Sequence, residues 1–108
     1  MRRLVAVALA GSVAALCAMP AFAGPKDAEA EKALHQALEV DYLETRFDKA
    51  EQTLRSAIER CGGSDCSPGV RARLFAALGA VLAGGKKQLE DARDCFVEAL
   101  KLIARIAM

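Results

Sequence analysis

The chain has 108 residues, too few for more than one ordinary domain. Its 15 basic and 14 acidic residues are mixed along the sequence, which leaves no concentrated patch of one sign. Nucleic-acid binding and attachment to an anionic membrane surface are therefore excluded as primary functions.

The first 23 residues have the pattern of a secretory signal peptide. Arg2 and Arg3 form a positive n-region, residues 4–19 are almost wholly apolar, and Ala21-Phe22-Ala23 supplies the small-x-small motif that signal peptidase reads. We expect cleavage after Ala23 and export of the mature chain to the periplasm or cell envelope.

Two other readings of this segment fit it less well. A membrane-spanning helix needs about 20 apolar residues, whereas this run has 16 and ends at the helix breaker Pro20. A lipoprotein signal would need a small residue before Cys17, where Leu16 stands. An uncleaved signal anchor remains the alternative, and we expect no membrane span in the mature chain.

Cleavage changes the charge and the cysteine count. Loss of Arg2 and Arg3 leaves 13 basic against 14 acidic residues, a net charge near −1. Three cysteines remain, at positions 61, 66 and 95. In an oxidising compartment this set indicates one disulfide and one leftover thiol.

The first half of the mature chain predicts a helical hairpin over residues 28–60. After a short flexible leader, residues 24–27, Asp27 can cap a helix whose apolar residues recur three and four apart as far as Tyr42. A second such stripe runs from Phe47 to Ile58. The break between them is only a few residues long, and connections that short turn consecutive helices back on each other.

The second half predicts another hairpin over residues 68–108. The glycines of the loop at residues 61–67 suit a helix end, and Ser67 followed by Pro68 is an N-cap followed by a first helical residue. One apolar stripe then runs from Val70 to Leu82, and another begins at Leu89. Strict apolar–polar alternation is absent, so we predict an all-α fold of two antiparallel hairpins.

The two hairpins repeat a packing pattern. An alanine is followed four residues later by a large apolar residue and three later by another alanine, in both Ala50, Leu54, Ala57 and Ala92, Phe96, Ala99. Together with the pair Leu78-Gly79, this pattern resembles the tetratricopeptide repeat (TPR) family. The resemblance covers Ala28 to Ile103 and implies a two-repeat α-solenoid fragment. Ala50 and Ala92 lie 42 residues apart, where the family has about 34, and the usual closing proline is missing.

The resemblance also implies a function. Members of the family bind an extended or helical peptide in a groove that the first helix of each hairpin lines. The resemblance thus implies a non-catalytic interaction module whose partner is another envelope protein or peptide. The groove candidates are Gln36, Glu39, Arg71, Arg73 and Ala77.

The cysteines offer a structural and a chemical interpretation. Cys61 and Cys66 are separated by four residues without a bulky side chain, and a disulfide closing so small a loop contributes about 2 kcal/mol. Redox pairs have two intervening residues and a different fold. A metal site would need His35 and the cysteines to converge, yet none has the spacing of structural zinc ligands. We therefore favour a structural disulfide between Cys61 and Cys66, with Cys95 buried on the last helix.

No catalytic group or cofactor motif is recognisable. His35 is the sole histidine and has no evident nucleophile beside it, and the sequence has neither a nucleophile elbow nor a phosphate-binding glycine loop. We expect no enzyme activity and no cofactor.

The last helix predicts a contact surface. A polar capping helix normally closes a repeat array, and about three repeats are normally needed. This chain has two, and its final helix ends in apolar residues. We expect a C-terminal contact edge at Leu102, Ile106 and Met108, which is also compatible with a homo-oligomer. A structural subunit that buries this face permanently is the alternative function.

Overall fold

The computed structural model describes residues 24–107, and every regular element in that range is helical. Helix α2 spans Asp27–His35 and continues as a π-helical turn, η1, over Gln36–Asp41. Helix α3 spans Phe47–Cys61. Helix α4 spans Pro68–Ala80 and continues as the π-helical turn η2 over Val81–Gly85, and α5 spans Leu89–Ala107. The all-α prediction is confirmed. The predicted signal peptide, residues 1–23, and Met108 lie outside the described residues.

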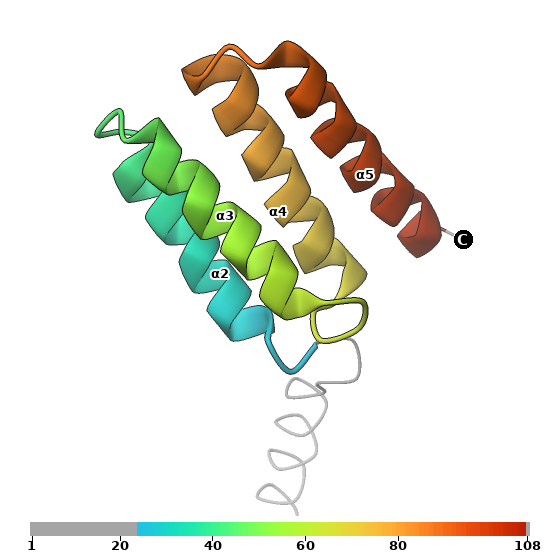
Figure 1. The fold of residues 1–108 in the computed structure, drawn as a ribbon. Coiled ribbons are helices and arrows are strands. Elements are labelled where there is room, and N and C mark those ends of the chain that lie inside the picture. Colours follow the sequence, from blue (N-terminus) through green and yellow to red (C-terminus); the bar gives the residue numbers. More distant parts are fainter. Residues whose placement is uncertain (1–23, 108) are drawn as a thin grey trace, which may run out of the picture.

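The helices lie side by side, and each runs antiparallel to the one before it (Figure 1). Helix α2 packs against α3 and α4, while α4 also packs against α3 and, most extensively, against α5. Short connections between the elements produce this order. Helix α4 thus lies in the middle of the fold, and α5 forms one edge.

The start of α2 differs from the prediction. Asp27 is the first helical residue rather than its N-cap, and its carboxylate accepts one backbone N–H from Gly24 (2.9 Å) and another from Ser67 (2.8 Å). The Lys26 N–H donates to the carbonyl of Asp65 at 2.8 Å. The leader expected to be flexible is therefore hydrogen-bonded to the loop 40 residues further along the chain.

The loop between α3 and α4 follows its predicted chemistry. The sulfur atoms of Cys61 and Cys66 lie at bonding distance, with their Cα atoms 5.0 Å apart, so the predicted disulfide is confirmed. Gly62 has a φ of +55° at the end of α3, a conformation that favours glycine. The Ser67 hydroxyl accepts the Val70 N–H at 3.4 Å, as an N-cap does.

Both π-helical turns occupy the end of the first helix of a pair. The N–H groups of Tyr42 and Lys86 each donate to the carbonyl five residues earlier. In a π-helical turn the hydrogen bond spans five residues instead of the four of an α-helix, and such turns occur as single short segments. Chain reversal follows each of them, through Thr45 and Lys87, which both have positive φ.

The core consists of leucines and alanines between the helices. Its largest fully buried apolar side chains are Leu54, Leu74, Leu78, Val81 and Leu82. Small residues allow close approach: a Cβ atom at Gly79 would lie 2.8 Å from the ring of Phe96. The alanines of the repeated pattern are also buried, because the partner helix approaches closely at those positions.

Candidate binding groove

A groove of about 630 Å³ lies between α2 and α4. Its apolar lining consists of Leu34 from α2, Leu38 from η1, and Ala76 and Ala77 from α4. Residues three or four apart share one face of a helix, and this spacing aligns the lining side chains on each helix. The two alanines leave the space open, because a larger side chain at either position would fill it.

Charged side chains border the groove. Arg73 on α4 pairs with Glu31 on α2, which connects the two helices across the groove, and His35 pairs with Glu39 four residues later in η1. All four side chains are at least half exposed. Exposed pairs of this kind contribute about 0–1 kcal/mol each, so they are available to exchange partners with a ligand.

The five predicted groove residues have different positions. Glu39, Arg73 and Ala77 line the groove together. Gln36 instead donates its side-chain amide to the Asp41 carboxylate at 3.0 Å, and Arg71 is half buried with a Nε atom that has no hydrogen-bond partner. Neither of these two belongs to the groove lining. Partner binding at the other three remains a prediction.

Sequence reasoning missed five lining residues: Glu31, Leu34, His35, Leu38 and Ala76. Their signal was present, since they lie three or four positions from one another or from the predicted Arg73 and Ala77. His35 was considered only as a base or a metal ligand.

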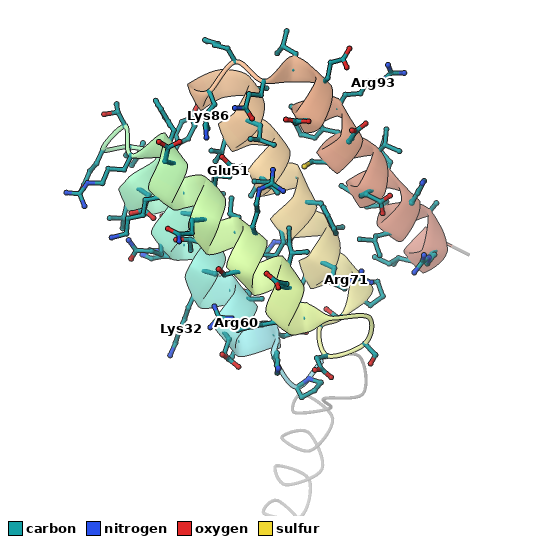
Figure 2. The ribbon with its side chains drawn as sticks, in the orientation of Figure 1. Lys32, Glu51, Arg60, Arg71, Lys86 and Arg93 are labelled. Atoms are coloured by element: carbon teal, nitrogen blue, oxygen red, sulfur yellow. A yellow bond between two sulfur atoms is a disulfide. The ribbon has the colours of Figure 1, made fainter. Side chains whose placement is uncertain are left out.

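An ion-pair cluster holds the ends of α3 and η2 together. The ammonium of Lys86 lies 2.6 Å from carboxylate oxygens of both Asp48 and Glu51, and Figure 2 shows Glu51 and Lys86 directed toward each other. Hydrogen bonds from Lys86 and then Arg55 lower the pKa of Glu51, and the bonds to Asp48 and Glu51 raise the pKa of Lys86. The first and second pairs of helices are thereby joined at this end of the fold.

Cys95 is unpaired and buried beside a cavity of about 290 Å³ that Ile58, Phe75 and Leu78 also line. Burial raises the pKa of its thiol, with further increases from Asp91 and other nearby carboxylates. A raised pKa lowers the thiolate fraction and therefore the reactivity. Within residues 24–107, no group of three His, Cys, Asp or Glu side chains is arranged to hold a metal ion.

The predicted C-terminal edge is partly wrong. Leu102 is buried, with 2% of its surface exposed, because it continues the face of α5 that packs on α4. Ile106 is exposed, and Met108 lies outside the described residues. The exposed apolar side chains of α5 are instead Leu89, Phe96, Val97, Leu100, Ile103 and Ile106.

No protein-family model matches this sequence, and no curated protein or solved structure shows significant similarity to it. None of the helices in the described part of the chain is long and apolar enough to cross a membrane. The described residues by themselves define an all-helical fold with one disulfide and a groove between its first and third helices.

Proposed function

We propose that this chain is a non-catalytic, TPR-like interaction module of the bacterial cell envelope that binds a peptide segment of another protein in the groove between α2 and α4. The observation that carries the proposal is the groove itself, an open channel with an apolar floor and charged rims. A few placed polar groups around an apolar surface are the usual composition of a binding site.

The helix packing supports the TPR-like part of the proposal. In this family the first helices of successive repeats line the concave face, and here α2 and α4 are in contact and form the groove. Ala50 and Ala92 are both buried, and Gly79 touches Phe96, as the repeated pattern requires. Most of the excess of the 42-residue spacing over the usual 34 comes from the disulfide loop between α3 and α4.

The groove is suited to small apolar side chains presented at regular spacing. Its floor has no buried charge, so an extended or helical segment with apolar residues on one face would cover it without leaving a charge unpaired. Glu31 and Glu39 lie on the same helix and would orient a segment that has basic residues on its flanks.

Export is the second part of the proposal. A disulfide such as Cys61–Cys66 persists in oxidising compartments and is rare in the bacterial cytosol. Together with the signal-peptide pattern of residues 1–23, it favours a periplasmic or envelope location.

Selection from a random peptide library on the purified protein tests the binding function. We expect the selected peptides to perturb amide NMR signals of groove residues, and Arg73→Glu and Ala76→Trp to weaken their affinity by about tenfold, as changes at the centre of an interface do.

The matched controls are Lys32→Glu and Ala80→Trp, which reverse a positive charge and insert a tryptophan at exposed positions outside the groove lining. Figure 2 shows Lys32 projecting away from the neighbouring helices. Both controls should retain affinity. Peptides that shift signals elsewhere, or that bind all four variants alike, would contradict the proposal.

A further inference from the structure

The backbone nitrogen of Gly24 is in contact with a carboxylate. It lies 2.9 Å from Oδ2 of Asp27, and Oδ1 of the same carboxylate accepts the N–H of Ser67 at 2.8 Å. The carbonyl of Gly24 in turn accepts the N–H of Asp27 at 3.1 Å. The first described residue is therefore held at a defined place, beside the start of α2 and the loop between α3 and α4 (Figure 1).

The surrounding loop leaves room only for a glycine at position 24. A Cβ atom there would lie 2.6 Å from both the carbonyl oxygen of Asp65 and the Cα atom of Cys66. Both are backbone atoms, and Cys66 is joined to Cys61 by the disulfide, so they cannot move aside as a flexible side chain would. The position of the Gly24 nitrogen is thus fixed by close packing as well as by its hydrogen bond.

The charged groups at this corner leave Asp27 without a cation. Lys26 pairs with Asp65 at 3.6 Å, and the guanidinium of Arg60 lies 4.0 Å from Glu29. The ammonium of Lys26 also donates to the carbonyl of Arg60 at 3.2 Å. None of the ion pairs within residues 24–107 includes Asp27, whose partners are backbone N–H groups. A positive charge beside Asp27 would therefore be neutralised without disturbing another pair.

The expected removal of the signal peptide creates such a charge. Hydrolysis of the peptide bond between Ala23 and Gly24 adds one water molecule, which leaves a carboxylate on Ala23 and an amino group on Gly24. An α-amino group has an ordinary pKa of about 7.7–8.0, so it is mostly protonated at neutral pH. The nitrogen that is a neutral amide in the uncleaved chain thereby becomes an ammonium group.

We propose that removal of the signal peptide stabilises the fold through an ion pair between the new N-terminal ammonium of Gly24 and the carboxylate of Asp27. This inference rests on the proposed export and goes beyond it, because it gives cleavage an effect on stability. A charge-assisted hydrogen bond is stronger than one from a neutral donor. The contact at 2.9 Å therefore gains strength once the chain is processed, whereas the uncleaved chain has only the amide hydrogen bond.

The ion pair and the disulfide act on the same loop. Cys61–Cys66 closes the loop whose Asp65 carbonyl and Ser67 N–H hold the leader. Disulfides form in oxidising compartments, and a signal peptide is removed from the exported chain. Both covalent changes that accompany export therefore stabilise one corner of the fold, and the protein is more stable outside the cytoplasm than before it is exported.

Selective acetylation of the α-amino group tests the ion pair, on protein purified from the envelope fraction of cells that express the whole sequence. Acetylation removes the charge but keeps an N–H donor, and peptide mapping confirms that the lysines are unmodified. Urea unfolding at pH 7 measures the effect. We expect acetylation to increase the unfolding equilibrium constant by about fivefold, the upper end for a partly exposed ion pair.

Two variants separate the ion pair from other effects of the acetyl group. In Asp27→Asn the carboxylate is absent, so acetylation should leave the unfolding equilibrium constant unchanged. Asp65→Asn is the matched control, because its carboxylate belongs to the same corner but pairs with Lys26. Acetylation of this variant should still have the full effect of about fivefold.

The pH dependence gives an independent result. Asp27 should hold the folded pKa of the α-amino group above its ordinary value. The ion pair then contributes its full stability below the unfolded pKa of about 7.7–8.0, and this contribution is lost as pH rises through the folded pKa. The difference between free and acetylated protein should therefore be present at pH 7 and absent by about pH 10. The lysines titrate in both proteins, so their effect cancels.

Failure of export and failure of the ion pair give different results. An intact mass that includes residues 1–23 would overturn both. A processed chain whose stability acetylation leaves unchanged would overturn the ion pair alone. The same holds if acetylation has equal effects on wild type and Asp27→Asn, or if its effect persists undiminished at pH 10.

Discussion

The carboxylate of Asp27 is expected to be a stabilising contact, and Asp27→Asn removes it with little change of shape. The two oxygens accept the N–H groups of Gly24 and Ser67, and so hold the leader, the start of α2 and the disulfide loop together. Asparagine offers one acceptor oxygen, so one of the two N–H groups loses its partner. The variant also removes a negative charge from the first turn of a helix, where it is favourable.

The loss can be estimated from these two contributions. A hydrogen bond to a charged group is worth about 1.5–3 kcal/mol, and the lower end applies here because both bonds are only partly buried. Interaction with the helix dipole adds about 0.3–1 kcal/mol. We therefore expect the free energy of unfolding to fall by about 2 kcal/mol and Tm by about 8–16 °C for a domain of this size. Urea unfolding followed by circular dichroism at pH 7 measures the change in the free energy of unfolding.

The pH dependence gives a sharper test. Partial burial acts to raise the pKa of Asp27, but hydrogen bonds from Ser67 and Gly24 outweigh it and lower the pKa below its ordinary value. A carboxylate with a lowered folded pKa stabilises the protein above its unfolded pKa, and this contribution is lost as pH falls through the folded pKa. The difference between wild type and Asp27→Asn should therefore shrink below about pH 4.

Asp65→Asn is the matched control, because Asp65 belongs to the same loop and its carboxylate forms only an exposed pair with Lys26 at 3.6 Å. It should cost less than about 0.5 kcal/mol. The reasoning is refuted if the two variants lose equal stability, or if the effect of Asp27→Asn is the same at pH 3 and pH 7.

Three further predictions concern the same end of the molecule. Cys61→Ser should lower the free energy of unfolding by about 2 kcal/mol relative to wild type. Reduction of the disulfide in wild type should remove this difference between the two proteins. Gly24→Ala places a methyl group 2.6 Å from backbone atoms of Asp65 and Cys66, so it should cost about 1–3 kcal/mol, whereas the same change at exposed Gly63, which has open space around it, should cost far less. Intact-mass measurement of protein from the envelope fraction should show a chain that begins at Gly24, and a mass that includes residues 1–23 would contradict export with cleavage.

Features with local causes could be predicted from the sequence. The Ser67 cap, the first helical position of Pro68 and the helix end at Cys61 depend on residues within one turn of each other, and all three are in the structure. The disulfide is also local, because only four residues separate its cysteines. The number of helices could also be predicted, because apolar periodicity is a local pattern as well.

Features that depend on distant partners could not be predicted in this way. The role of Asp27 is set by Ser67, 40 residues away, so the sequence alone favoured a simple cap. Leu102 was placed on the outer edge because the end of α5 is apolar on several faces. Its burial is decided by the face that α4 covers, which begins at Ala92 and continues at three- and four-residue steps.

The groove was found in part for a related reason. Arg73 and Ala77 could be assigned from helical position, but Gln36 and Arg71 lie on other sides of their helices, where Gln36 bonds Asp41 and Arg71 is half buried. The π-helical turn over Gln36–Asp41 was also not anticipated, because no sequence signal identified it. The buried, half-satisfied carboxylate of Asp41 follows from the same turn and was likewise not anticipated.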